Sequence, residues 1–419
     1  MAIQIGSIDD DALAQGSGLK AAKSSPNEYP INSDRAKHHA QRMLDRIREA
    51  HAAGKRKKAD YLTQKYLQSY DAKYIATREA LRGLAKSRRP SPALLPVIAE
   101  GLDAWQGTDE DVLLRFQPKE SNPNEFRPIL DFGIERRSLQ YLVRSVLQIR
   151  ADQHPNQYLL KGIHKAVARV AELLADGSKW AIETDIKNCY TSFDGEKVPG
   201  LLPLPRRVTR GSLLSVSLNV KFHPFWASLL VQPGEGAKDL MSAPELVDAR
   251  RGFPQGSAAS PLAVEMLLAP LFAQLPNCGA SIGYADNFLA MASCQSDALS
   301  VTSALCSALN AHPAGHLEPK PPRIYEPGEP ILFLGHQFSR HGGSVRIHPA
   351  PRNEAKFCDR MHQGLDAIRS SPNAWQAARL TQKLKRYVKS WTGAFGLCTG
   401  IEARRMLAFK HIEQALKYC

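Results

Sequence analysis

The hydrophobic pattern of the N-terminal part of the chain predicts helices. From Ser33 onward, apolar residues recur every three or four positions, as on one face of an amphipathic helix, and Ser33 is suited to cap that helix. A second helical stretch contains Tyr61, Tyr66 and Tyr70, and a third covers about 72–86. These tyrosines either pack inside a helical bundle or form, with nearby Lys and Arg, a face for RNA. Core packing is the favoured interpretation for any single tyrosine.

The middle of the chain alternates strand-like runs with helical segments. Helices are expected at about 135–150 and 163–176, a mostly helical insertion at 195–250, and a helical region at 351–419. Short apolar runs bounded by turn residues predict the strands. They are a pair around the polar loop SNPN (116–132), a run at 180–190, a hairpin (281–292) and a run at 331–338. This pattern, without a repeat of fixed period, favours an α+β fold.

Length and charge narrow the class of protein. The 419 residues suggest two to four structural units, and 43% hydrophobic with 23% charged residues is typical of a soluble globular protein. No apolar run approaches the roughly 20 residues of a membrane span, and the N-terminus does not resemble a signal peptide. The seven cysteines have no metal-binding spacing, so a reducing cytoplasm is expected.

The net charge of +14 favours a polyanionic partner, usually nucleic acid. The excess is concentrated at the C-terminus, where 351–419 carries 13 Lys and Arg against 5 Asp and Glu. Basic charge of this kind is also compatible with simple solubility, so it sets an expectation rather than a function.

Two aspartates lie where strands are predicted to end. Asp185 closes the run WAIETD, and Asp286 stands at the tip of the hairpin SIGYADNFLAMA. A lone Asp in a turn is usually structural, but two aspartates on adjacent strand ends can share a pair of divalent ions. Glu183 points to the same side of its strand as Asp185. The spacing leaves open whether the two strands are neighbours.

A glycine-bearing loop precedes a long apolar helix. In GFPQGSAASPLAVEMLLAPL, Gly252 and Gly256 make the loop flexible, Ser260 can cap the helix, and Pro261 suits its first turn. Such a loop lets the backbone approach a nucleotide closely. The alternative is a simple tight turn into a buried helix.

The order of five motifs resembles that of reverse transcriptases. FRPILDF, ETDIKNCYTSFD, GFPQGSAASP, YADN and FLGHQF follow one another at plausible separations over about residues 110–345. The segments before and after resemble the flanks of bacterial group II intron-like enzymes. The chain is therefore similar to bacterial reverse transcriptases of the retron, group II intron-like or phage-defence type.

The resemblance implies a right-hand polymerase with fingers, a palm of antiparallel sheet plus helices, and a helical thumb. The implied divisions are a flexible tail (1–32), an N-terminal helical extension (33–108), fingers (109–179), a palm (180–345, with the helical insertion 195–250) and a helical basic thumb (346–419).

The family pattern also assigns roles to residues. Asp185 and Asp286, with the backbone of Ile186, would hold Mg²⁺, with Mn²⁺ as the alternative ion. The implied nucleotide-binding residues are Lys119, Arg127, Tyr190, Gln255, Gly256 and Lys320. Among them, Tyr190 would exclude a ribose 2′-OH and Lys320 would protonate pyrophosphate, with solvated surface charge or core packing as the plain alternatives. Phe333, Leu334 and Gly335 would support the primer end, and Lys383, Lys385, Arg386 and Lys389 would bind RNA.

One position departs from the family pattern. The family usually has a second aspartate where this chain has Asn287, so one negative charge is missing from the implied catalytic group. The implied activity is RNA-directed DNA synthesis from dNTPs on an RNA template or structured noncoding RNA, giving a DNA product, and the implied setting is anti-phage defence in the cytoplasm, away from membranes. Oligomerisation or a companion protein is left open. The alternatives are untemplated or protein-primed synthesis, and an inactive RNA-binding scaffold.

Overall fold

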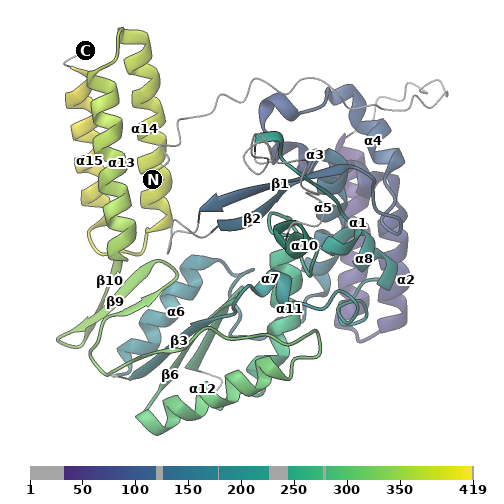
Figure 1. The fold of residues 1–419 in the computed structure, drawn as a ribbon, viewed down its shortest axis with the longest axis horizontal. Helices are drawn as coiled ribbons and strands as arrows, with labels where there is room; N and C mark the ends of the chain where they lie inside the picture. The colour runs from purple at the N-terminus through teal and green to yellow at the C-terminus, as the bar shows by residue number, and fades with distance from the viewer. Residues whose placement is uncertain (1–32, 119–125, 178, 226–243, 277–279, 418–419) are drawn as a thin grey trace, which may run out of the picture. The chain divides into compact units, whose positions relative to one another are not determined.

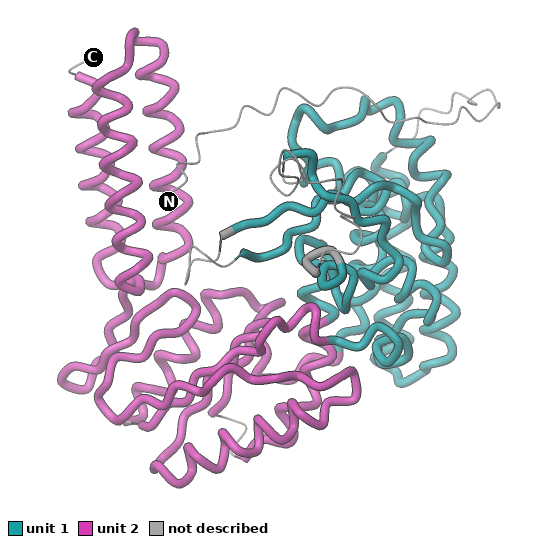
Figure 2. The backbone as a smooth tube through the Cα atoms, viewed as in Figure 1, with its two compact units in different colours: residues 1–151, 193–263 teal, residues 152–192, 264–419 magenta. Residues whose placement is uncertain are grey.

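The computed structural model describes residues 33–417 except 119–125, 178, 226–243 and 277–279. The expected flexible tail at 1–32 lies outside the described residues. The chain divides into two compact units, coloured separately in Figure 2. The first comprises 1–151 and 193–263, and the second comprises 152–192 and 264–419. No helix of the described residues is long and apolar enough to cross a membrane.

The first unit begins with the helices that the apolar spacing predicts. α1 (Ser33–Ala52), α2 (Arg56–Gln68) and α3 (Tyr70–Arg82) pack with α5 (Ile134–Arg150). The smaller helical elements of this unit are η2 (Lys86–Arg88), η3 (Pro92–Leu94), α4 (Leu95–Gly101), α8 (Arg206–Leu213), η4 (Ser215–Ser217) and α10 (Pro244–Ala249). Tyr66 is buried, whereas Tyr61 is 58% exposed with the Lys65 ammonium above its ring. The tyrosines of α2 therefore divide between the two interpretations.

A small sheet completes the first unit. β1 (Asp111–Pro118) pairs antiparallel with β2 (Phe126–Asp131), which confirms the two expected strands. On its other side β1 pairs in parallel with β4 (Asn219–Phe222), a strand inside the segment predicted to be mostly helical. Val112, Leu114, Leu130 and Val220 pack together beneath this sheet. The pairing of β1 with β4 joins positions more than 100 residues apart, which no local pattern indicates.

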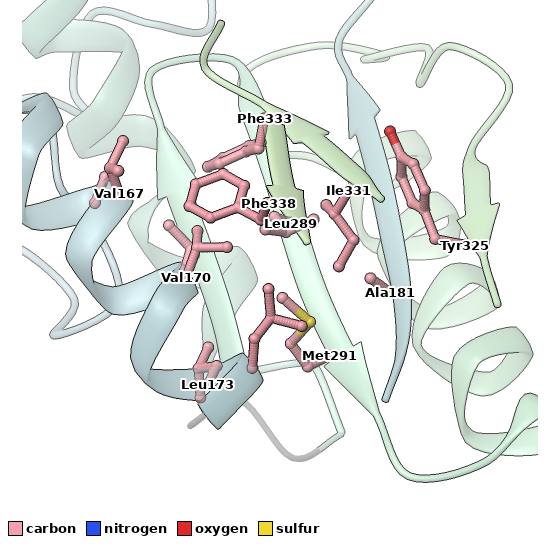
Figure 3. Packing of buried hydrophobic residues seen from close by; sticks show 13 residues of the cluster. Val167, Val170, Leu173, Ala181, Leu289, Met291, Tyr325, Ile331, Phe333 and Phe338 are labelled. Atoms are coloured by element: carbon pink, nitrogen blue, oxygen red, sulfur yellow. The ribbon is translucent and has the colours of Figure 1, made fainter. Parts of the chain in front are cut away.

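The second unit is built on an antiparallel sheet in the order β5-β6-β3-β7. Its strands are β3 (Trp180–Asp185), β5 (Ser281–Tyr284), β6 (Asn287–Ala292) and β7 (Arg323–Tyr325). Alternate residues of β6 point to opposite faces. Leu289 and Met291 pack with α6 (Ile163–Ala175), as Figure 3 shows, while Ala290 and Ala292 lie in the cluster that includes α12 (Gln295–Asn310). Because helices pack on both faces of the sheet, β6 is apolar at every position after Asn287.

Two further parts belong to the second unit. A sheet of β8 (Ile331–Phe333), β9 (His336–His341) and β10 (Ser344–Pro349) also packs on α6. The chain then forms three helices packed on one another, α13 (Pro351–Arg369), α14 (Ala374–Ala394) and α15 (Ile401–Leu416), labelled in Figure 1. The expected run at 331–338 is thus a tight hairpin, and the helical C-terminus is confirmed. The division into fingers, palm and thumb stays a prediction.

Candidate functional site

The structure joins the two strand ends that carry the predicted metal ligands. β3 and β6 pair antiparallel, with Asp185 directly opposite Asn287. Tyr284 pairs with Asn287, so Ala285 and Asp286 form the two-residue turn between β5 and β6. The backbone N–H of Ile186 donates to the carbonyl of Asp286 at 3.3 Å. The two strands that carry the aspartates are therefore neighbours, and Asp185, Ile186 and Asp286 lie together where these strands end.

Lys320 contacts Asp185 through both its backbone and its side chain. Its backbone N–H donates to the Asp185 carbonyl at 2.8 Å, and its ammonium lies 2.7 Å from Asp185 Oδ2. The Asp185 side chain is 30% exposed, yet its other oxygen, Oδ1, is buried and has no hydrogen-bond partner among the described residues. A carboxylate oxygen is costly to bury without a donor, and a bound water or cation would satisfy it.

A divalent ion fits these donors. The described residues contain no group of three His, Cys, Asp or Glu side chains suited to a metal. Two carboxylates with a neighbouring backbone are instead the ligand supply typical of Mg²⁺, which keeps several waters and takes substrate phosphate oxygens. The unpaired Oδ1 of Asp185, beside Asp286, is the observation that favours such an ion.

Asn287 contacts the predicted ligand beside it. Its amide Nδ2 donates to Asp286 Oδ1 at 3.1 Å and to the Tyr284 carbonyl at 3.4 Å. An aspartate at this position has no proton to donate when ionised, so the Asn supplies a hydrogen bond that the usual family residue cannot. Asn287 therefore orients the Asp286 carboxylate in addition to removing a charge from the site.

Glu183, on the same strand as Asp185, is bonded to the neighbouring strand β7. The Tyr325 hydroxyl donates to Glu183 Oε2 at 2.7 Å, and Glu183 pairs across the sheet with Arg323. Burial raises the pKa of the Glu183 carboxyl, with the Tyr325 bond acting in the opposite direction. The bond from Tyr325 gives the Glu183 carboxylate a partner on β7.

Tyr190 stands on a short helix next to the aspartates. α7 (Cys189–Ser192) follows β3 after Asn188, whose φ of 49° is the left-handed conformation that reverses the chain. Burial raises the pKa of Tyr190, and the charge of Asp286 adds to the shift. Cys189 is buried, and its pKa is raised by burial and then by both aspartates. Tyr190 is thus close enough to Asp286 for the carboxylate to affect its pKa, and its contact with a sugar stays a prediction.

Three further predicted nucleotide-binding residues belong to the first unit. The Gln255 carbonyl accepts a hydrogen bond from the Leu130 N–H at 2.9 Å. Gly256 has a φ of 105°, and a Cβ there would lie 2.6 Å from the Leu130 carbonyl oxygen, so the position requires glycine. Arg127 is exposed on β2 opposite Gln117. Lys119 lies outside the described residues.

The predicted primer-supporting residues form a tight hairpin. Phe333 pairs with His336, so Leu334 and Gly335 are the two turn residues, with φ of 48° and 75°. Two positive φ values match a type I′ turn, in which a leucine is uncommon. The Phe333 side chain is buried in the core of the second unit. A primer could therefore contact the Leu334 and Gly335 turn but not the Phe333 ring.

The four predicted RNA-binding residues of α14 are not equivalent. Lys383, Arg386 and Lys389 are exposed, whereas the Lys385 ammonium lies 3.1 Å from Glu413 on α15. α14 contains no Asp or Glu, and Trp375 near its start is 72% exposed. Three of the four side chains are therefore available to phosphates, and Lys385 is engaged within the helical bundle.

One buried residue beside the aspartates was not predicted. Glu265 lies on α11 (Ser260–Phe272) and is 1% exposed. Its carboxylate accepts the backbone N–H of Ala285, the residue before Asp286. Burial raises the pKa of Glu265 to about 7, against the effect of its hydrogen bonds and of Lys161. The sequence contains a signal for it, since Glu265 is the only charged residue of an otherwise apolar helix.

Comparisons with known proteins give distant structural neighbours. No family model matches the chain, and no curated protein matches it. Telomerase from Candida albicans, in complex with a TWJ fragment of telomeric RNA, is similar at 11% identity and a TM-score of 0.37, over 75% of this chain and 61% of the other. Apo telomerase from Candida tropicalis, truncated from the C-terminal domain, has 12% identity and a TM-score of 0.34, over 58% and 56%. The chain thus spans less than two thirds of either neighbour, and similarity at this level carries no argument about function.

Proposed function

We propose that this protein is an RNA-directed DNA polymerase that adds dNTPs to a primer 3′-OH. The observation that carries the proposal is the meeting of Asp185 and Asp286 at adjacent strand ends, where a buried oxygen of Asp185 has no donor within the described part of the chain. The five ordered motifs supply the reaction class. Divalent ions bound by these carboxylates would activate the attacking oxygen and stabilise charge on the leaving oxygen.

The other residues of the site have separate tasks in nucleotidyl transfer. The primer O3′ forms a bond to the α-phosphorus, the bond from that phosphorus to the pyrophosphate oxygen breaks, and pyrophosphate leaves. Lys320, whose ammonium contacts Asp185, would give the leaving group a proton. Tyr190 would restrict the sugar at its 2′ position. Asn287 holds the Asp286 carboxylate through its amide.

The proposed substrate is an RNA template or a structured noncoding RNA. Lys383, Arg386 and Lys389 present an exposed basic face on α14, which suits the phosphates of a nucleic acid. The Leu334 and Gly335 turn would contact the primer end. Anti-phage defence follows from the resemblance to free-standing bacterial reverse transcriptases.

The test compares aspartate variants in a primed RNA template assay with dNTPs and Mg²⁺. Asp185→Asn and Asp286→Asn keep the side-chain shape but remove the charge, so each is expected to lose nearly all incorporation. Asp109→Asn, at an exposed position of the first unit, is the matched control and should retain wild-type activity. Unchanged incorporation in both active-site variants would refute the proposal.

Sequencing the products separates the alternatives. Products complementary to the added RNA support templated synthesis. Products of unrelated sequence, or products covalently attached to the protein, would identify untemplated or protein-primed synthesis. A wild-type protein that binds RNA but incorporates no nucleotide with Mg²⁺ or Mn²⁺ would be an inactive scaffold.

A further inference from the structure

A buried glutamate stands behind the turn that carries Asp286. Glu265 is 1% exposed on α11, whose other residues from Ser260 to Phe272 are uncharged. An ionisable side chain in such a position is costly to bury unless donors surround it. The hydrogen bonds of the Glu265 carboxylate therefore indicate its role.

Three donors from two segments converge on the Glu265 carboxylate. Oε1 accepts the Leu159 backbone N–H at 3.0 Å and the Gln153 side-chain amide at 3.2 Å. Oε2 accepts the Ala285 backbone N–H at 3.3 Å. One oxygen thus holds the segment 153–159 and the other holds the turn between β5 and β6. Only a group with two acceptor oxygens can make both connections at once.

The segment 153–159, hereafter the strap, also lies along β5. The Gly283 N–H donates to the Asn156 carbonyl at 2.8 Å, and the Tyr158 N–H donates to the Gly283 carbonyl at 2.9 Å. The Gln157 side-chain amide donates to the backbone carbonyl of Glu265. The strap therefore supports the strand that leads into the turn, and Glu265 connects the strap, α11 and the turn.

The turn needs such support because its first residue is strained. Ala285 has a φ of 54°, a conformation that favours glycine. Without an anchor on its N–H, the backbone there can relax toward an ordinary conformation. Asp286 follows directly, so any relaxation moves its carboxylate relative to Asp185.

We propose that Glu265 is a positioning residue that fastens the Asp286 turn to the strap through the Ala285 N–H. The inference rests on the proposed function for its catalytic consequence, but the fastening itself is a property of the fold. Glu265 acts through the backbone N–H of Ala285, the residue before Asp286.

The test uses Glu265→Gln, which keeps the size but leaves one acceptor oxygen for donors on both sides. Glu110→Gln is the matched control. Glu110 is a partly buried carboxylate of the first unit that likewise accepts two backbone N–H groups, from Glu135 at 3.4 Å and Arg136 at 2.9 Å. Hydrogen–deuterium exchange of peptides covering 281–288, Mn²⁺ affinity by electron paramagnetic resonance, and primer extension kinetics are measured for both variants.

Loss of one of the two acceptor oxygens should weaken the bond to the Ala285 N–H, speed exchange at the turn and weaken Mn²⁺ binding by about tenfold in Glu265→Gln. The rate constant kcat should fall, while KM for the dNTP changes little, because the variant alters none of the residues predicted to bind the nucleotide. Glu110→Gln should alter none of these quantities at the Asp286 turn. Equal exchange at 281–288 and equal Mn²⁺ affinity in wild type and folded Glu265→Gln would overturn the proposal.

The exchange and Mn²⁺ measurements do not require an active enzyme. A wild type that incorporates no nucleotide would therefore refute the proposed function while these two readouts still decide the role of Glu265. If Glu265→Gln does not fold, Gln153→Met removes a single donor to Oε1 from the strap. It should show the same changes at reduced size, and an unaffected turn in that variant would overturn the proposal.

Discussion

Asn287→Asp is the most informative substitution at the proposed site, because it restores the usual family residue and breaks an observed contact. In this protein the Asn287 amide donates to Asp286 Oδ1 at 3.1 Å. The variant replaces that donor with a second carboxylate at the same place. A hydrogen bond is thus exchanged for repulsion between like charges, in the absence of a cation.

The size of the effect follows from two contributions. A hydrogen bond to a charged group is worth roughly 1.5–3 kcal/mol. Two like charges about 4 Å apart repel by about 4 kcal/mol near a protein surface. Both side chains are partly exposed, so solvent screening reduces this, and we expect a net loss of about 2 kcal/mol in metal-free protein. For a unit of this size that is a fall in Tm of about 4–8 °C.

A divalent ion should reverse the loss. If the variant is less stable than wild type without metal but equally stable with metal, its metal binding must be stronger by the same free energy. About 2 kcal/mol corresponds to about 30-fold in affinity. The Mg²⁺ concentration for half-maximal primer extension should therefore fall by up to that factor while activity is kept. The Tm difference from wild type should close as Mg²⁺ is added.

The assay is thermal unfolding in EDTA and across a Mg²⁺ titration, with primer extension in the same buffers. Asn373→Asp is the matched control, because Asn373 caps α14 through the Gln376 N–H and an aspartate caps equally well. The same Tm for wild type and Asn287→Asp in EDTA, with the same Mg²⁺ midpoint, would refute the reasoning. A wild type inert with both metals and activated by the substitution would instead favour the scaffold alternative.

Three other predictions address separate parts of the second unit. Tyr190→Ala should raise rNTP use relative to dNTP use in competition assays; an unchanged ratio in a folded variant would make Tyr190 a core residue. Neutralising Lys383, Arg386 and Lys389 together should lower the slope of log affinity against log salt by about 2 for single-stranded RNA. Lys385→Gln, whose ammonium pairs with Glu413, should leave the slope nearly unchanged. A similar effect of both changes would contradict the assignment of the first three residues. Burial lowers the pKa of His336, so the unfolded chain binds the proton more readily than the folded protein. The His336 Nδ1 bonds the Leu334 carbonyl, and its buried Nε2 has no partner among the described residues. Stability should therefore decline as pH falls below about 6.5, and urea titrations at pH 5.5 and 7.5 should show a smaller decline in His336→Gln.

Local pattern predicted much of the fold and part of the site. The three- and four-residue spacing placed α1, α5 and α6, and the apolar runs placed β3 and the β5–β6 hairpin, because these periods reflect which face of each element is buried. Asp185 at a strand end and Asp286 in a turn followed from the same local reasoning. The single strand expected at 331–338 was wrong, since Leu334 and Gly335 fold it into a hairpin.

Tertiary structure alone decided which of these residues meet. The pairing of β3 with β6 sets Asp185 opposite Asn287, and Lys320 reaches Asp185 from 135 positions further along the chain. Register across a sheet depends on packing both of its faces at once, and that information is spread over distant segments. The same holds for Glu265. Its isolation in an apolar helix was visible in the sequence, but its bond to the Ala285 N–H exists only because α11, the strap and β5 pack together.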